Sequence, residues 1–173
     1  ILIVIIIFLF LIFNNSKTYS NKDFVKKVEN ISQVIKENYS INGQVRFILK
    51  DISIGAAETR KYPFKDYIVI IDKNKLNGIN DIELKGLLSH EMSHLETYSK
   101  MNSVQLLIYA LIYELSNDFK KQVERSTDMK AIEKGYGKEL SDYREFRLKT
   151  ANEKDRKVLE KYYLGVEEIE DLR

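Results

Sequence analysis

The chain has 173 residues, and its 28 Lys and Arg nearly balance its 26 Asp and Glu, leaving a net charge of +2. That length suits one compact domain with an appendage, and the balanced charge argues against a nucleic-acid-binding protein, which needs a concentrated basic surface. The absence of cysteine excludes a disulfide scaffold, a thiolate zinc site, an iron–sulfur cluster and a cysteine nucleophile.

Residues 1–13 contain no polar side chain. A helix of this length spans about 20 Å, less than the roughly 30 Å of a bilayer core. The sequence does not begin with Met, however, and we expect the apolar segment to continue before residue 1. We expect residues 1–16 to form a single-pass N-terminal membrane anchor. The alternatives are the core of a cleaved signal peptide, which would leave the domain secreted, and a buried core helix. Four lysines follow within residues 17–27 and favour a cytoplasmic position for the domain.

The first half of the remaining chain predicts one helix and two strands. Apolar residues at helical spacing predict an amphipathic helix over residues 20–39, with Ser20 as its N-cap. Alternating apolar and polar residues predict a half-buried strand over 45–49, and a continuous apolar run predicts a buried strand over 67–71. Between them, residues 51–64 are ambiguous.

From Asn80 onward the sequence predicts almost nothing but helix. Asn80 forms a capping-box pattern with the glutamate three residues later, at the start of a helix that should end near residue 98. A second helix is expected over 103–134, with a bend, and is stopped by the glycines of residues 135–137. Shorter helices should fill residues 140–171.

The order of helix, strands and then helices is typical of an α+β fold. We expect three parts: the apolar segment 1–16, a domain over 17–150 and a charged helical tail over 151–173. The stretch 104–115 is strongly apolar but too short to span a bilayer, and we expect a core helix there, with contact to a membrane surface as the alternative. The tail is expected to be a solvated amphipathic helix. A second hypothesis has it covering the cleft and keeping an enzyme latent.

Both histidines of the protein lie in one motif, His90-Glu91-Met92-Ser93-His94. Residues four apart share one helix face, so the two imidazoles converge on one point, as two ligands of a zinc ion do. Glu91 lies beside the first ligand and is placed to act as the general base that takes a proton from the attacking water. Leucines at helical spacing around the motif predict a helix that faces the core.

A catalytic zinc site needs a third protein ligand and one open position. Because no other His or Cys exists, that ligand must be Asp or Glu. The best candidate is Glu124, thirty residues after His94, and Asp128 lies one turn further on the same face, where it could accept a hydrogen bond from a ligating imidazole. Asp128 itself, Glu114 and Glu96 are the competing candidates.

With HExxH on one helix and Glu-x-x-x-Asp on a later one, the sequence resembles the gluzincin metallopeptidases. Within them it is most similar to the CAAX prenyl endopeptidase and heat-shock membrane peptidase group, and above all to the small minigluzincins of archaea. The resemblance extends over about residues 52–137. It implies a zincin-like fold, in which a small antiparallel or mixed sheet is accompanied by an active-site helix and a glutamate helix.

The resemblance also implies zinc-dependent endopeptidase activity, with His90, His94 and Glu124 as ligands and Glu91 as the base. The sequence departs from the family pattern at Ser93 and Thr127, where relatives often have Gly and Ala. The substrate-binding edge strand is not clear, and Gly55-Ala56-Ala57 is the nearest stretch.

Many relatives use another His to stabilise the oxyanion, and this chain has none left. Tyr136, Tyr143 or Arg144 would have to donate to the developing charge. The resulting prediction is a membrane-tethered zinc endopeptidase that acts on a peptide or protein and binds no nucleic acid. A zinc-stabilised, non-catalytic interaction module at a membrane and a non-peptide metallohydrolase are the alternatives, and the sequence does not specify an oligomeric state.

Overall fold

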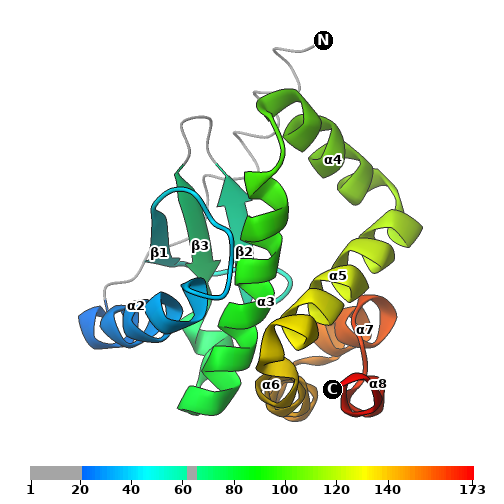
Figure 1. Ribbon diagram of the computed structural model, residues 1–173. Helices are drawn as coiled ribbons and strands as arrows, with labels where there is room; N and C mark the ends of the chain where they lie inside the picture. The colour runs from blue at the N-terminus through cyan, green and yellow to red at the C-terminus, as the bar shows by residue number, and fades with distance from the viewer. Residues whose placement is uncertain (1–20, 62–65) are drawn as a thin grey trace.

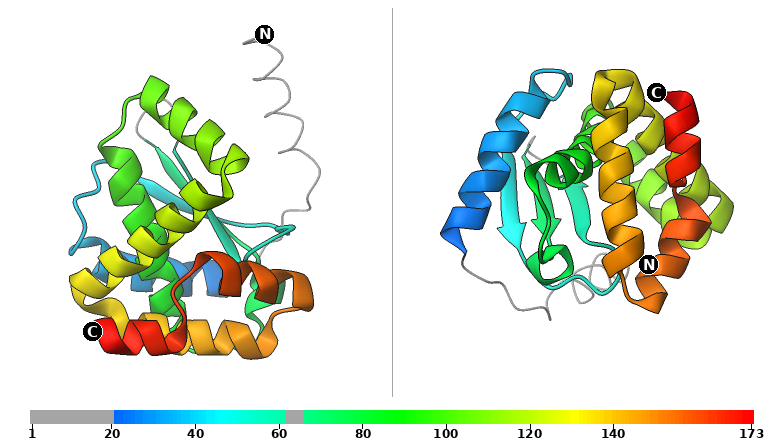
Figure 2. Two further views of the ribbon diagram at one scale, coloured as in Figure 1. Left: turned by 90° about the vertical axis from the view of Figure 1, so that its right-hand side faces the viewer. Right: turned by 90° about the horizontal axis from the view of Figure 1, so that it is seen from below.

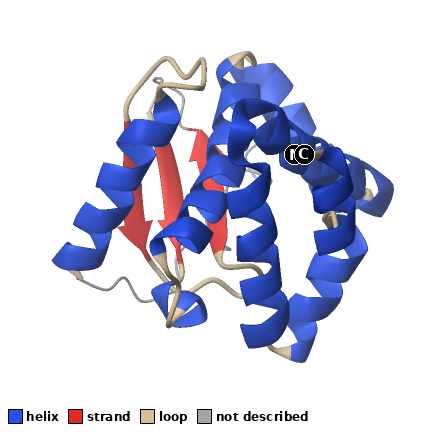
Figure 3. Cartoon of the chain, turned by 60° about the horizontal axis from the view of Figure 1, so that its bottom comes forward, coloured by secondary structure: helices blue, strands red, loops and turns tan. Residues whose placement is uncertain are grey.

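The computed structural model describes residues 21–61 and 66–173 and has an α+β fold, with a small mixed sheet and mostly helices around it (Figures 1 and 3). The expected membrane anchor over residues 1–16 lies outside the described residues. Within the described ranges, no helix combines the length and the apolar character needed to cross a bilayer.

The sheet has three described strands in the order β1-β3-β2. β1 (Val45–Leu49) pairs in parallel with β3 (Tyr67–Ile71), and β2 (Ala57–Lys61) pairs with β3 in antiparallel register. Both predicted strands are confirmed with their bounds, and all five residues of β3 are buried. β2 lies in the segment that the sequence left ambiguous. It was not predicted, because its polar residues do not alternate with apolar ones as in a half-buried strand.

α2 (Lys22–Lys36) packs against β1 and against α3 (Asp81–Ser99). Its N-cap is Asn21, whose side chain accepts the backbone N–H of Phe24, so the prediction of Ser20 as the cap is wrong. Val28, Ser32 and Ile35 form its buried face. The helix ends three residues earlier than predicted, at Lys36.

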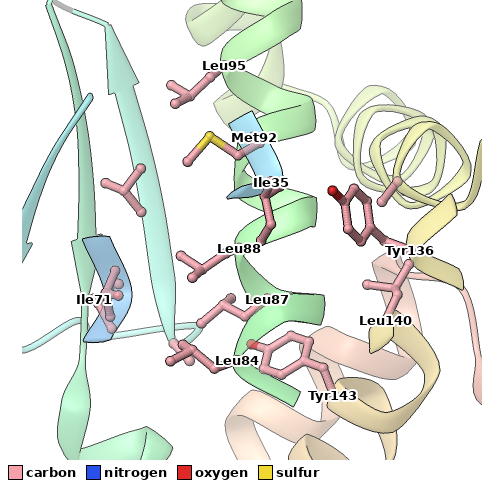
Figure 4. Close-up of a cluster of buried hydrophobic side chains, with 14 of the residues drawn as sticks. Ile35, Ile71, Leu84, Leu87, Leu88, Met92, Leu95, Tyr136, Leu140 and Tyr143 are labelled. Atoms are coloured by element: carbon pink, nitrogen blue, oxygen red, sulfur yellow. The ribbon is translucent and has the colours of Figure 1, made fainter. Parts of the chain in front are cut away.

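α3 is the central element of the fold, lying between the sheet and α6 (Gly137–Thr150) (Figure 4). Asn80 accepts the backbone N–H groups of Ile82 and Glu83, and the Glu83 carboxylate accepts the N–H of Asn80, which confirms the predicted capping box. The leucines around the motif are buried, as predicted. Figure 4 shows the apolar side chains of α3 that extend toward the sheet: Leu84, Leu88, Met92 and Leu95.

The single long helix predicted over residues 103–134 is in fact two helices, α4 (Ser103–Leu115) and α5 (Asn117–Ala131). The break falls at Ser116, which has an extended backbone and caps α5 by accepting the N–H of Phe119. No residue of α4 is buried, so the prediction of a core helix there is wrong. In Figure 1 α4 lies at the edge of the fold, between the end of α3 and the start of α5.

The predicted stop at residues 135–137 is confirmed, because Gly135 has non-helical dihedrals and separates two helices that meet in a kink. A π-helical turn, η2 (Ile132–Tyr136), contains Gly135 at φ 87°, a left-handed conformation that glycine adopts without a Cβ clash. α6 follows directly and crosses α3 at Gly86, where a Cβ would lie 2.0 Å from the carbonyl oxygen of Glu139. Only glycine allows this close approach.

The C-terminal residues form α7 (Glu153–Tyr162) and α8 (Val166–Leu172), which pack beside α5 and α6 (Figure 2). Leu164 and Ile169 belong to the same hydrophobic cluster as β3 and α3. Asp155 is buried and pairs with Arg147 of α6 and with Lys75 of a short 3-10 helix, η1 (Lys73–Leu76). These contacts connect the tail to both halves of the chain.

Candidate metal centre

The structure brings together the two histidines of α3 and Glu124 of α5. The Nε2 atoms of His90 and His94 lie 3.1 Å apart, and Glu124 Oε2 lies 3.2 Å from the first and 3.4 Å from the second. The three residues are 5%, 6% and 2% exposed. They form the one group of at least three His, Cys, Asp or Glu side chains, within the described ranges, that could hold a metal ion.

The spacing of these three atoms fits a tetrahedral zinc ion. Ligand atoms at about 2.0–2.1 Å from zinc lie about 3.3 Å from one another in a tetrahedron. In addition, Glu124 Oε2 is buried and has no hydrogen-bond partner in the described part of the chain. A buried carboxylate oxygen without such a partner is costly, and a cation between it and the two imidazoles would satisfy it.

Hydrogen bonds on the far side of each ring orient the imidazoles. His90 Nδ1 lies 2.7 Å from Asp128 Oδ1, so its N–H donates to the carboxylate and Nε2 is left to face Glu124. Thr127 Oγ1 donates to the carbonyl oxygen of Val123 and lies 3.4 Å from His94 Nδ1, where its oxygen can accept. Both Nε2 atoms therefore point to the same centre.

Asp128 is completely buried and is held from three sides. Besides His90, Arg144 Nη2 donates to both carboxylate oxygens at 3.1 and 3.0 Å, and the backbone N–H of Leu164 donates at 3.0 Å. Arg144, expected from the sequence as an oxyanion donor, thus has its guanidinium engaged with Asp128. The guanidinium also lies over the ring of Tyr163, 4.6 Å from its centroid.

The charges of the site reinforce one another. Burial alone would lower the pKa of His90, but the carboxylates of Asp128 and Glu124 outweigh it and raise this pKa from 6.5 to about 10. Burial would raise the pKa of Glu124, but His94 and His90 hold it well below its usual range. The centre therefore favours a positive charge strongly, and in the absence of metal a proton on His90 supplies it.

Glu91 lies next to the centre, in a pocket between the start of β2, α3, α6 and α7. Thr59 of β2 donates a hydrogen bond from its hydroxyl to Glu91 Oε2, which ties the carboxylate to the edge of the sheet. We call this hollow the Glu91 pocket. Its lining includes Ala57, His90, Glu91, Tyr143, Arg144 and Tyr163.

Of the two tyrosines expected as oxyanion donors, only Tyr143 lines the Glu91 pocket. Burial raises its pKa to about 12, so the phenol keeps its proton at neutral pH. Tyr136 lies elsewhere: its hydroxyl accepts from Asn38 at 2.6 Å, and its ring stacks on Tyr39.

The competing carboxylates do not join the metal centre. Glu96 accepts the backbone N–H of Ser40 at 2.9 Å and pairs with Lys134 at 3.3 Å. Glu114 is exposed on α4.

Several residues contact the site although the sequence did not predict them as site residues. Tyr113 of α4 donates its hydroxyl proton to Glu124 Oε1, the oxygen that faces away from the histidines. Tyr163 lies with its ring centroid 5.6 Å from that of His90. These contacts, like those of Thr59 and Thr127, join residues at least eleven apart in the sequence, which helix or strand periodicity does not relate. The HExxH and Glu-x-x-x-Asp motifs therefore do not predict these contacts.

Two curated proteins are similar in sequence to part of this chain. The protein named Protease HtpX homolog from Dictyoglomus thermophilum is 26% identical over 134 residues, covering 68% of this chain and 44% of that protein. The protein of the same name from Dictyoglomus turgidum is 25% identical with the same coverage. The chain thus spans less than half the length of these curated relatives. No protein-family model matches the chain, and no solved structure matches it significantly.

Proposed function

We propose that this protein is a zinc-dependent endopeptidase. The observation that carries the proposal is the convergence of His90 Nε2, His94 Nε2 and Glu124 Oε2, within 3.1 to 3.4 Å of one another and beside the Glu91 carboxylate. The names of the two similar Dictyoglomus proteins, which denote proteases, support the same reaction class.

In this proposal His90, His94 and Glu124 hold the zinc ion, which would polarise the scissile carbonyl and make water more acidic. Glu91 is the general base: it accepts a proton from the attacking water and passes it to the leaving nitrogen. The Thr59 hydroxyl donates to Oε2 of this carboxylate, and we assign the proton transfer to Oε1. Tyr143, which retains its hydroxyl proton, is the donor we assign to the developing oxyanion.

β2 supplies a site for an extended peptide or protein substrate. It lies at one edge of the described strands, next to α3, and it carries Thr59, which contacts the base. A peptide added as a further strand would pair with the backbone of β2 and pass in front of Glu91. Attachment to a membrane through residues 1–16 is part of the same proposal and rests on their apolar sequence.

Two substitutions test the proposal, with zinc content and peptide cleavage both measured. Glu91→Gln should retain zinc and lose cleavage by a factor of about 10² to 10⁴, because only the proton acceptor is removed. Glu124→Ala should lose both. Glu160→Gln, at an exposed position of α7, is the matched control and should change neither.

The substrate panel should contain unrelated peptides together with phosphate and ester compounds. Cleavage of peptides alone supports the endopeptidase, whereas hydrolysis of only the other compounds would identify a different metallohydrolase. Bound zinc without hydrolysis of any compound would contradict the enzyme and favour a zinc-stabilised interaction module. Retained peptide cleavage in Glu91→Gln would falsify the assigned base.

A further inference from the structure

α4 exposes its apolar side chains to solvent instead of burying them. Six large aliphatic residues of this one helix are between 40% and 78% exposed: Val104, Leu107, Ile108, Leu111, Ile112 and Leu115. At 100° per residue they fall within an arc of about 140°, which is the width of a helix face that normally packs on a core. Gln105 borders the arc on one side and Glu114 on the other.

The opposite face of α4 fixes the orientation of the helix. The Tyr109 ring packs edge-on against Tyr98 and Phe119, with centroids 5.8 and 5.3 Å away, and Tyr113 donates to Glu124. These contacts hold the inner face against α3 and α5. The outer aliphatic face cannot turn inward without breaking them.

We propose that the outer face of α4 docks on a lipid bilayer, with the helix lying in the plane of the interface. At about 20 Å in length α4 is too short to span the hydrocarbon core, but its arc of aliphatic residues is suited to shallow insertion. Glu114 is its only charged residue, at the border of the arc. Lys100 is exposed just before the helix and lines the same surface hollow as Ile108 and Ile112, where its ammonium group would meet lipid phosphates.

Two further observations favour lipid over a protein partner. The face consists of Val, Leu and Ile alone, and it lacks the Trp, Tyr and Arg side chains that anchor most protein interfaces. The same chain also carries thirteen consecutive apolar residues at positions 1–13, a composition suited to a bilayer. A contiguous apolar patch that is exposed to solvent, like the outer face of α4, usually marks an interaction site. This inference does not depend on the proposed catalytic activity.

The chain has no tryptophan, so a single introduced tryptophan reports on its own surroundings. Leu111→Trp places the probe in the middle of the outer face. Ile82→Trp places the control at an exposed position at the start of α3, the end remote from α4. Both full-length variants are mixed with phospholipid vesicles brominated in the acyl chains, with and without an anionic lipid. Circular dichroism checks that each variant is folded.

We expect vesicles to shift the emission of Leu111→Trp to shorter wavelength and bromine to quench it, more strongly with the anionic lipid. Ile82→Trp should show neither effect, even if residues 1–13 tether both variants to the vesicle. Adding Ile108→Asp and Leu115→Asp to Leu111→Trp should abolish the quenching. Equal responses of the two probes, or no response of either, would overturn the proposal. A blue shift of Leu111→Trp that needs no lipid and grows with protein concentration would also overturn it, because a second copy would then cover the face.

Discussion

The fully buried carboxylate of Asp128 on α5 connects α3, α6 and the segment before α8. Its oxygens accept from His90, from the Arg144 guanidinium and from the N–H of Leu164. A buried ion pair adds little stability by itself, but removing one partner leaves an uncompensated charge at a cost of about 3–5 kcal/mol. Asp128 therefore fixes the ring of His90 through a group that has no freedom to move.

Asp128→Asn tests that role. The amide keeps the size of the carboxylate but loses the charge that Arg144 and His90 require, so zinc affinity should fall about 10- to 100-fold. Competition with a chromophoric chelator measures it. Asp142→Asn, which removes the half-buried partner of Lys138 on α6, is the control and should leave zinc affinity unchanged. Equal zinc affinities for Asp128→Asn and the control would refute the positioning role.

The raised pKa of His90 predicts how the stability of the metal-free protein depends on pH. A group whose pKa rises on folding stabilises the native state fully below its unfolded pKa, here 6.5, and loses that contribution as the pH approaches about 10. The pKa of Glu124 is lowered, so its contribution is present above 4.5 and is lost below it.

We therefore expect the melting temperature of the metal-free protein to fall as the pH rises from 6.5 to 10. Calorimetry in the presence of a chelator measures this fall. His90→Gln should flatten the dependence, because the titrating group is gone. A slope that is identical in His90→Gln would show that other groups cause it.

At the scale of elements, the crossing of α3 and α6 depends on one residue without a side chain. A Cβ on Gly86 would lie 2.0 Å from Glu139 O and 2.5 Å from Glu139 C, both backbone atoms that cannot rotate away. Gly86→Ala should therefore separate the helices and destabilise the protein by about 1–3 kcal/mol or more, measured by chemical denaturation.

Gly165→Ser is the control for that substitution. The nearest atom to its Cβ is a glutamate side-chain oxygen at 3.6 Å, an ordinary contact, and serine is a favourable N-cap for α8. It should unfold at the same denaturant concentration as the parent or a higher one. If Gly86→Ala behaved like Gly165→Ser, the close approach of the two helices would be disproved.

The comparison of sequence and structure shows which elements local patterns can predict. The run 67–71 and the Asn80 cap depend on side chains next to one another in the sequence, and both were predicted correctly. β2 could not be recognised, because its polar residues are held by pairing with β3 and by the contact of Thr59 with Glu91. For α4, hydrophobicity predicted burial, whereas no residue of the helix is buried in the part of the chain that the structure describes. An apolar helix face predicts contact with another apolar surface, but it does not show whether that surface belongs to the same chain.

At the scale of the whole molecule, residues 151–173 bear on both stability and the site. Leu164 and Ile169 are 2% and 0% exposed, and burial of such side chains contributes about 1.5–3 kcal/mol each. Deletion of these residues should lower the melting temperature markedly, measured by circular dichroism, and weaken zinc binding through the lost bond to Asp128. A truncated chain that melts as the full chain does and cleaves peptides faster would instead support a tail that only covers the cleft.

The hydrogen bond from Leu164 to Asp128 also has a consequence for protein synthesis. A ribosome delivers α3 first, then α5 and α6, and the last donor to Asp128 only after all of these. Until then the carboxylate that orients His90 lacks one of its partners, and α8 has not yet covered the core. A nascent chain should therefore gain its full affinity for metal only after residues 164–172 have been synthesised and have packed against α6, so that the proposed protease activity would not appear before that point.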